Sequence, residues 1–480
     1  MGWLSLLPAG AVRALRGFLL KQGRRMGGAA MLARSQSSAL RACMQAARHS
    51  PAYRALLQES GIAPSGIGPQ TDLASLPVLT KTNTFERFPL AQLARPLPAA
   101  ALADVLTSSG RGGRSYGFRL TAREQYEDAW FDIDLGLQDI FGVDDKPTLL
   151  VNCLPMGVVF HSRAVAVANV SVREDMACSI LRDVGPGFAQ TLLCTDPMFI
   201  RRLLDEGQRV GVDWRALGTS AILGEEVLVE AQRDYIAARM GIDIDNDPHR
   251  VVGSSFGVGE LGLNLLFETR ETIRMRRAMR SNAEVAQLLC ATTALDAMPS
   301  VFCYNPLRSH LEVLNPDANG FGELCITMLG SGSVIPLPRY ATGDMARLVP
   351  LHHAQQAATL AGVQPPWLPL VLVQGRIKDR PAGMPSVESI KELIYLDHTI
   401  ADQLSGAFRL EHAGNGQTRL TLQANHAQLP SPALQQGLLQ LCARHGLGGM
   451  EMCVLGLEEF PWRPALDYER KFDYVAPHLR

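Results

Sequence analysis

The stretch Pro147-Thr-Leu-Leu-Val-Asn-Cys-Leu154 indicates the fold class of this chain. It is a continuous apolar run bounded by prolines, which is typical of a strand buried on both faces of a parallel sheet. Residues 187–195 and 219–223 have the same character. Residues 196–206 predict a helix opened by an Asp-Pro pair, and residues 225–240 predict a second helix. This alternation predicts an α/β domain with a largely parallel sheet.

Other parts of the chain differ from this central pattern. Glu225 and Glu226 are expected at the positive N-terminus of the second helix, and Gly241 is expected to end it. After about residue 300 the apolar runs shorten and predict a β-rich subdomain. Residues 352–369, rich in Gln, Ala and Pro, predict a loop. Residues 386–455 predict a compact tail of helices and strands.

The composition is that of a globular protein without a preference for polyanions. The chain has 480 residues, of which 47% are hydrophobic and 19% charged, and its net charge is −1. This length predicts two or three domains, and the charge balance makes nucleic acid a poor partner. The nine cysteines are scattered and form no C-x-x-C pair. They indicate reduced thiols in a cytoplasmic protein rather than disulfides or a zinc site.

The first 31 residues combine Leu and Ala with five basic side chains: Arg13, Arg16, Lys21, Arg24 and Arg25. Their apolar stretches are shorter than the roughly 20 residues that span a bilayer. The basic residues follow the apolar part, whereas in a signal peptide they precede it. Packing of a helix onto the main domain is the favoured interpretation. A basic amphipathic helix that touches a membrane surface is the alternative.

A loop dense in glycine and hydroxyl groups, Thr107-Ser-Ser-Gly-Arg-Gly-Gly-Arg-Ser115, follows a short apolar run. Backbone N–H groups and Ser or Thr hydroxyls in such a loop can surround phosphate oxygens, and Arg111 and Arg114 can add charge. The G-x-x-x-x-G-K-[ST] pattern of a Walker A loop is absent. From the residues alone, phosphate binding and an ordinary flexible loop remain equally good interpretations.

Two carboxylates each follow a glycine turn. Glu260 lies in Phe256-Gly-Val-Gly-Glu260, where it could hold Mg²⁺ against a triphosphate or simply begin a helix. Asp344 lies in Tyr340-Ala-Thr-Gly-Asp344, where it could accept hydrogen bonds from a ribose diol or serve as a turn residue. For each residue taken alone, the structural interpretation is favoured.

Three further residues carry chemistry only in combination with these motifs. Arg376 lies in Gly375-Arg-Ile-Lys-Asp379, just before Pro381 and Gly383, a context usual for a solvated linker. Lys471 lies near the end of the chain, where a lysine is normally solvated. His161 is expected to be a packed histidine rather than a catalytic one.

In combination these motifs resemble those of the adenylate-forming superfamily of acyl-CoA synthetases and related ligases. The chain is most similar to the branch that contains phenylacetate–CoA ligases, CapK-like proteins and acyl-protein synthetases of the LuxE type. The likeness runs over most of the chain. It is carried further by four segments: Ser50-Pro-Ala-Tyr-Arg54, Leu76-Pro-Val-Leu-Thr-Lys81, Leu223-Gly-Glu-Glu226 and Met384-Pro-Ser-Val-Glu-Ser-Ile-Lys-Glu392.

The resemblance implies an α/β fold in three parts. Residues 1–60 would form an N-terminal helical segment. Residues 61–375 would form a large AMP-binding domain with parallel-type sheets and a β-rich subdomain. Residues 376–480 would form a small, mobile α+β domain.

The resemblance also implies roles for individual residues. Lys471, Glu260 and Arg376 would be catalytic. Lys471 would neutralise charge at the reacting carboxylate and α-phosphate, Glu260 would bind Mg²⁺, and Arg376 would lie at a hinge and contact ribose or phosphate. Asp344 would bind the ribose hydroxyls. The other expected ATP- or AMP-binding residues are Thr107, Ser108, Ser109, Gly110, Gly112, Gly224, Glu225, Ser255, Phe256 and Gly257.

The implied function is ATP- and Mg²⁺-dependent activation of a carboxylic acid as an acyl-adenylate, followed by transfer to a thiol. The acceptor would be CoA, a carrier protein or a protein cysteine, and the protein could be a homodimer. Two alternatives remain open: a LuxE-like acyl-protein synthetase, and a non-catalytic binding protein. The second alternative is motivated by departures from the usual motifs. Gly259 replaces a Thr or Ser, the phosphate loop lacks its Thr-Gly-x-Pro ending, and Lys471 lacks a preceding Gly.

Overall fold

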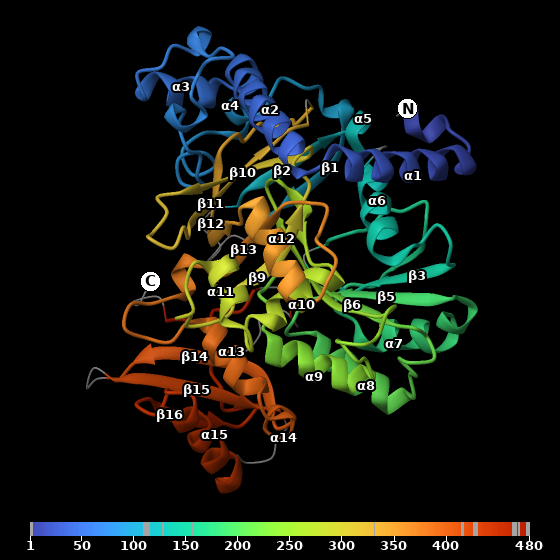
Figure 1. Cartoon of the computed structure of the whole chain (residues 1–480), viewed down its shortest axis with the longest axis vertical. Coiled ribbons are helices and arrows are strands. Elements are labelled where there is room, and N and C mark those ends of the chain that lie inside the picture. Colours follow the sequence, from blue (N-terminus) through green and yellow to red (C-terminus); the bar gives the residue numbers. More distant parts are fainter. Residues whose placement is uncertain are drawn as a thin grey trace.

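The structure is a computed structural model that describes residues 3–108, 116–126, 129–155, 157–330, 332–413, 417–425, 431–462, 468 and 471–476. An eleven-stranded sheet runs through it in the order β10-β11-β12-β13-β9-β8-β7-β6-β5-β3-β4 (Figure 1). A two-stranded sheet (β1 and β2) and a three-stranded sheet (β14, β15 and β16) are separate from it.

One half of the large sheet is parallel, as the apolar runs predicted. It consists of β3 (Thr148–Asn152), β4 (Ala166–Asn169), β5 (Gln190–Thr195), β6 (Ser220–Leu223) and β7 (Val252–Val258). Helices cover both of its faces, so successive side chains of one strand enter different cores. In β3, Leu149 and Val151 pack with α7 (Glu174–Asp183), α8 (Ile200–Val210) and α9 (Glu230–Met240). Leu150 packs on the other face with α6 (Ala129–Phe141) and α10 (Arg270–Ala278).

Two helix starts differ from the sequence prediction. α9 begins at Glu230, so Glu225 and Glu226 lie in the turn before it and not at its N-terminus. Glu225 takes the left-handed conformation with φ of 70°, which interrupts a helix at this point. α8 begins at Ile200 rather than at residue 196. Gly241 ends α9 with φ of 62°, as predicted.

The other half of the sheet is antiparallel and continues the first half through the pairing of β7 with β8. Its strands are β8 (Gly262–Phe267), β9 (Ser300–Tyr304), β13 (Leu370–Arg376), β12 (Tyr340–Leu348), β11 (Gly322–Met328) and β10 (Ser309–Leu314). The β-rich part after residue 300 therefore belongs to the same sheet.

The predicted loop at residues 352–369 is wrong over its first half, which forms α12 (Leu351–Leu360). Pro350 precedes the helix, and Ala and Gln are good helix formers. Ala354, Ala357 and Ala358 are buried in the core that also contains α11 (Ala283–Cys290). Burial of this small-residue face outweighs the Pro-rich composition of the residues that follow.

The N-terminal region is helical, as predicted, with α1 (Ala9–Met26), α2 (Gly28–His49) and α3 (Pro51–Glu59). Pro51 opens α3 at its first position, and the Ser50 hydroxyl accepts a hydrogen bond from the backbone of Tyr53. The elements up to α6 are completed by α4 (Leu90–Leu93), β1 (Leu102–Thr107), β2 (Phe118–Ala122) and α5 (Arg123–Tyr126).

Residues 380–476, here called the C-terminal segment, contain an α+β unit. It comprises α13 (Val387–Tyr395), α14 (His398–Ala401), β14 (Leu404–His412), β15 (Thr418–Ala424), α15 (Pro432–Arg444) and β16 (Glu451–Leu455). β14 and β15 are antiparallel, whereas β15 and β16 are parallel.

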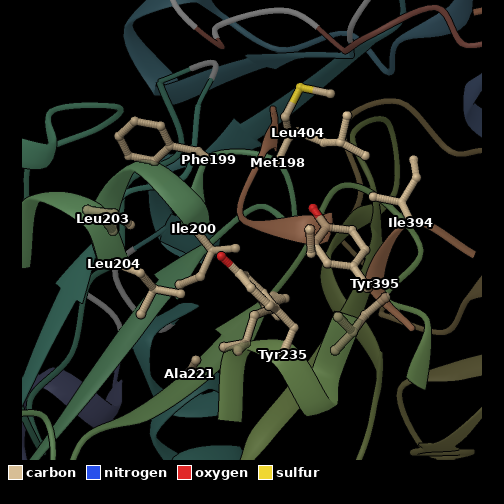
Figure 2. Packing of buried hydrophobic residues seen from close by; sticks show 14 of the residues in the cluster. Met198, Phe199, Ile200, Leu203, Leu204, Ala221, Tyr235, Ile394, Tyr395 and Leu404 are labelled. Carbon is tan, nitrogen blue, oxygen red and sulfur yellow. The ribbon is translucent and has the colours of Figure 1, made fainter. Parts of the chain in front are cut away.

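The C-terminal segment is packed against α8 and α9 through a shared hydrophobic core. Figure 2 shows Ile394, Tyr395 and Leu404 beside Tyr235 and the side chains of α8. Arg201 of α8 donates hydrogen bonds to the carbonyl oxygens of Leu404 and Asp402, each at 2.7 Å, and to that of Ala401. The buried guanidinium thus satisfies the end of α14 and the start of β14.

A cluster of four buried charges ties α9 and α10 to the end of β8. Arg233 pairs with Glu230 at 2.9 Å and with Glu268 at 2.8 Å, and Arg276 lies 3.2 Å from Glu230 and 3.6 Å from Glu268. All four residues are at most 4% exposed. Glu268 also accepts a hydrogen bond from the backbone N–H of Ser254 at 2.8 Å. The two positive and two negative charges balance, as buried charges require.

We expect Glu268→Gln to destabilise the protein strongly. The variant keeps the shape of the side chain but leaves two buried guanidinium groups with one carboxylate between them. Breaking a buried ion pair from one side costs about 3–5 kcal/mol. Urea denaturation should therefore give a free energy of unfolding lower by about this amount. Glu284→Gln, at an exposed position in the first turn of α11, is the matched control and should change little. Equal stability of the two variants would contradict the role of the cluster.

Asp196 is a buried carboxyl group without a cationic partner among the described residues. One of its oxygens accepts hydrogen bonds from the backbone N–H groups of Met198 (2.8 Å) and Phe199 (3.0 Å), and the other has no partner. Burial raises the pKa of Asp196 to about 7, and the nearby charges of Glu226 and Glu225 act in the same direction. The folded protein therefore favours the neutral acid.

We expect Asp196 to make stability pH-dependent. In the unfolded chain the group ionises near its ordinary pKa of 3.8, whereas in the folded chain it ionises near 7. Below pH 4 the carboxyl group is protonated in both states and does not affect stability. As the pH rises from 4 to 7, the free energy of unfolding falls by up to about 4 kcal/mol, because the folded protein disfavours the ionised group. Asp196→Asn should flatten the curve of unfolding free energy over this window. Asp213→Asn is the control, because this exposed aspartate accepts similar backbone hydrogen bonds. An unchanged curve in Asp196→Asn would contradict the assignment.

Candidate active site

The end of β1 and the start of β2 form one part of the candidate site. The N–H of Ser108 donates to the carbonyl of Gly117 at 3.0 Å, and the N–H of Gly117 donates to the Ser108 hydroxyl at 3.1 Å. Lys81 Nζ donates to the same hydroxyl at 3.2 Å. Thr107 is exposed at the end of β1. The predicted residues Ser109, Gly110 and Gly112 lie outside the described residues.

Lys81 reaches this position because the chain before it pairs with the start of β12. The N–H of Leu79 donates to Arg339 at 2.9 Å, and Leu79 accepts from Ala341 at 2.8 Å. This short parallel bridge fixes residues 76–81 beside the strand that also carries Asp344.

Glu260 lies in the turn between β7 and β8, with its side chain buried against the same part of the site. Its carboxylate is 4.0 Å from Lys81 Nζ. Burial, together with a hydrogen bond to this carboxylate, raises the pKa of Tyr340. A Cβ atom on Gly117 would lie 2.2 Å from Glu260 Oε1, so the close approach of β2 requires glycine.

The departure from the usual motif at Gly259 has a steric reason. A Cβ atom at this position would lie 3.0 Å from both Cα and Cβ of Ser108. Any larger residue would displace the end of β1. Gly259 therefore allows β1 to approach the β7–β8 turn more closely than a Thr or Ser would.

Asp344 and Arg376 face each other across β12 and β13. They are register partners, and Arg376 Nε is 4.0 Å from Asp344 Oδ1. Asp344 lies within β12 and not in a turn, although Gly343 before it has φ of 78°. Burial raises the pKa of Asp344, while Arg376 and Lys471 partly offset this shift.

The C-terminal segment contributes two lysines and a tyrosine to the same region. Lys471 Nζ is 2.9 Å from Glu225 Oε2. Glu226 pairs with Lys391 at 2.6 Å and accepts a hydrogen bond from Tyr474 at 2.8 Å. Burial alone would raise the pKa of Glu226, but Lys391, Tyr474 and Lys471 outweigh it and hold the pKa below its usual value. Glu226 is thus an anion that binds the C-terminal segment.

The remaining predicted residues lie where β6 and β7 end. Gly224 follows β6. A Cβ atom at this position would lie 3.7 Å from the backbone oxygen of Ser255. The Ser255 hydroxyl donates to Asn264 at 3.0 Å. Phe256 packs at the edge of the hydrophobic core below the antiparallel strands, and Gly257 is exposed. These residues line the carboxyl end of the parallel strands, where ligands of open α/β sheets bind.

The structure thus brings together Ser108 with Glu260, and Asp344 with Arg376, Glu225 and Lys471. Sequence reasoning missed the contacts of four residues: Lys81, Tyr340, Lys391 and Tyr474. Lys81 ended a quoted signature segment but had no assigned role. His161 is not packed in the core, because its ring is exposed and bonds the Tyr126 hydroxyl at 2.7 Å.

Glu260 is suited to Mg²⁺ only together with a ligand. Within the described parts of the chain there is no group of three or more His, Cys, Asp or Glu side chains that could hold a metal ion. Mg²⁺ in nucleotide sites is commonly held by one or two carboxylates and the substrate phosphates. A single buried carboxylate beside the end of β1 fits this arrangement.

Comparisons with known proteins agree with the geometry. No protein-family model matches the sequence. The chain is 24% identical over 208 residues to a phenylacetate-coenzyme A ligase of Thermus thermophilus, a match that covers 41% of this chain and 44% of that protein. The matched region therefore spans less than half the length of this relative.

Solved structures of CoA ligases share the fold of nearly the whole chain. A 2-hydroxyisobutyryl-CoA ligase in its postadenylation state, in complex with 2-HIB-AMP, has a TM-score of 0.64 at 15% identity, over 93% of this chain and 88% of that chain. An anthranilate CoA ligase in complex with anthranoyl-AMP has a TM-score of 0.50 at 13% identity, over 77% and 66% of the two chains.

The two states of one neighbour also differ in their likeness to this chain. The 2-hydroxyisobutyryl-CoA ligase in its thioesterification state has a TM-score of 0.53, against 0.64 in the postadenylation state, at nearly equal coverage. The resemblance to the adenylate-forming superfamily is confirmed at the level of the fold, and this chain has the architecture of its CoA ligases.

Proposed function

We propose that the protein is an ATP- and Mg²⁺-dependent ligase that activates a carboxylic acid as an acyl-adenylate and transfers the acyl group to a thiol. The observation that carries the proposal is the meeting of Lys471 with Glu225 beside the Asp344–Arg376 pair. These residues come from four distant parts of the sequence. The fold of the CoA ligases supports the same function.

In the first step, a carboxylate oxygen would attack the α-phosphorus of ATP, and the bond to the bridging oxygen of pyrophosphate would break. The Ser108 hydroxyl and Lys81 would bind the β- and γ-phosphates, and Lys471 would stabilise negative charge at the α-phosphate and the attacking carboxylate. Bound Mg²⁺ would neutralise phosphate charge, and Glu260 would hold it. Asp344 would accept hydrogen bonds from the ribose hydroxyls, with Arg376 beside it. Most of the rate enhancement would thus come from placement and charge neutralisation.

In the second step, the sulfur of a thiol would attack the acyl carbon, and AMP would leave. We propose that residues 376–480 act as a mobile domain that rotates about residues 376–380 between the steps. The domain division is then residues 1–60, 61–375 and 376–480. The contact of Lys471 with Glu225, beside the Asp344–Arg376 pair, supports the assignment of the present arrangement to the first half-reaction.

CoA is the favoured acceptor, with a carrier-protein thiol as the alternative. Transfer to a cysteine of this chain is disfavoured, because eight of the nine cysteines are buried and burial raises the pKa of each of these eight. Cys453 on β16 is the half-buried exception, so it would be the site in a LuxE-like enzyme. A thioester on the protein that survives denaturation and is absent in Cys453→Ser would favour that alternative.

We expect Lys471→Ala to separate the two half-reactions. Formation of acyl-AMP, measured by pyrophosphate release, should fall by a factor that corresponds to about 3–4 kcal/mol, because a charge donor to the transition state is missing. Transfer from preformed acyl-AMP to CoA should be retained, because the domain would by then have rotated away. Loss of both half-reactions in equal measure would contradict this role of Lys471.

Lys391→Ala is the matched control for this experiment. Lys391 is also a lysine of the C-terminal segment, but it pairs with Glu226 rather than with Glu225. Glu226 also accepts a hydrogen bond from Tyr474. Removal of Lys391 should loosen the packed segment without removing the charge at the reacting centre. Adenylation should therefore fall much less in Lys391→Ala than in Lys471→Ala.

We expect Glu260→Gln to abolish the dependence of ATP binding on Mg²⁺. The variant removes the charge and keeps the volume of the side chain in its tight space against Gly117. In calorimetry, Mg²⁺ should strengthen ATP binding to the original protein and have little effect on the variant, while thermal unfolding stays similar. Normal pyrophosphate release and an unchanged Mg²⁺ response would show that Glu260 is not a metal ligand.

A further inference from the structure

The N-terminal part of the chain has an extreme charge composition. Its first 58 residues contain nine Lys and Arg and no Asp or Glu, although the whole chain contains 46 Lys and Arg and 47 Asp and Glu. The remainder is therefore strongly acidic. Such an asymmetry concentrates positive potential on one part of the surface and favours an anionic partner there.

One face of α1 is used for packing on the protein. Val12, Arg16 and Leu20 are buried, with spacing of one helical turn. Some of the basic residues pair with acids on α6 or just after it: Arg16 with Asp144, Arg24 with Asp139 and Arg13 with Asp145. These contacts fix the orientation of the helix, which confirms the packed interpretation of this segment.

Outside this packed face, the exposed part of α1 combines apolar and unpaired basic side chains. Phe18 is 55% exposed, Leu19 40% and Met26 38%. Lys21 and Arg25, one helical turn apart, are exposed and have no acidic partner in the described part of the chain. We call these five residues the outer face of α1. Large apolar side chains next to free cations are the composition of helices that lie in a membrane interface.

A cleft of about 510 Å³ lies along the basic edge of this face. It is lined by Gly17, Leu20, Lys21, Arg24, Arg25 and Gln138. Lys21 and Arg25 at this cleft can contact phosphate oxygens, whereas Arg24 is paired with Asp139. Phe18, Leu19 and Met26 lie on the side of the helix away from the cleft. Around the helix, the basic side chains are therefore followed by the apolar ones. A lipid has the same order of groups, since its charged headgroup is followed by apolar acyl chains.

We propose that the outer face of α1 docks the protein on an anionic membrane surface. Lys21 and Arg25 would bind lipid phosphate groups, and Phe18, Leu19 and Met26 would enter the boundary between headgroups and acyl chains. An acidic protein could also satisfy the cations, but it would need a complementary apolar surface for three side chains that are spread around the helix. A membrane interface accepts such side chains without that shape complementarity. Among the described residues, no helix is long and apolar enough to cross a membrane.

α1 lies far from the C-terminal segment (Figure 1), so membrane docking through α1 would not cover that segment. In Figure 1, α1 lies at the upper right and the C-terminal segment at the lower left. Docking through α1 would therefore leave the C-terminal segment facing away from the membrane. The inference does not depend on the proposed ligase activity, because it rests only on α1 and its surroundings.

Co-sedimentation with lipid vesicles tests the proposal. The full chain should bind vesicles that contain phosphatidylglycerol and phosphatidylcholine, bind pure phosphatidylcholine weakly, and be released in part by salt. Each removed cation should lower the partition coefficient about fivefold. K21Q/R25Q should therefore lower it about 25-fold, and K21E/R25E should lower it further. F18S/L19S should weaken binding but leave its salt dependence.

The matched control for K21E/R25E is R215E/R444E. It makes the same change of net charge at exposed arginines outside the N-terminal region, and it should bind anionic vesicles like the original chain. Thermal unfolding of all variants checks that the fold is kept. Equal loss of binding in the control would show that only net charge matters and would overturn the proposal. Absence of binding to anionic vesicles, or binding to a soluble acidic polypeptide alone, would also overturn it.

Discussion

The buried cluster of Arg233, Arg276, Glu230 and Glu268 is the constraint on which the candidate site depends. Glu268 holds the backbone of Ser254 just before the turn that carries Glu260, and Glu230 begins the helix that follows Glu225 and Glu226. Arg233 also donates to the carbonyl of Val252 in β7. The positions of two separate motifs are therefore set by one network of charges. Such a network has few alternative arrangements, because each member left unpaired in the core is costly.

The parallel half of the fold could be predicted because its strands are uninterrupted apolar runs. Leu149, Leu150 and Val151 are all buried, since helices cover both faces of the sheet. The C-terminal region was also predicted correctly as a tail of helices and strands over residues 386–455. The failures have local causes. The start of α9 was misplaced because Glu225 has a left-handed conformation that its residue type does not signal. The α12 helix was missed because its buried face consists of alanines.

The candidate site was less predictable than the fold because its contacts join distant segments. The motif residues were found, but their partners depend on the packing of the chain. Lys81 meets Ser108 only because Leu79 pairs with the start of β12. Gly259 looked like a lost functional residue, whereas the structure gives it a steric role against Ser108. Periodicity contains no information on such pairs, so the interpretation of a motif departure requires the fold.

The packing of the C-terminal segment on α8 and α9 has a thermodynamic consequence. Any rotation that separates the two would expose Ile394, Tyr395 and Leu404 to water and would release the carbonyl groups held by Arg201. Exposure of apolar surface raises the heat capacity. A catalytic cycle limited by this rotation would thus have a positive activation heat capacity, and a plot of the logarithm of its turnover against inverse temperature would be curved.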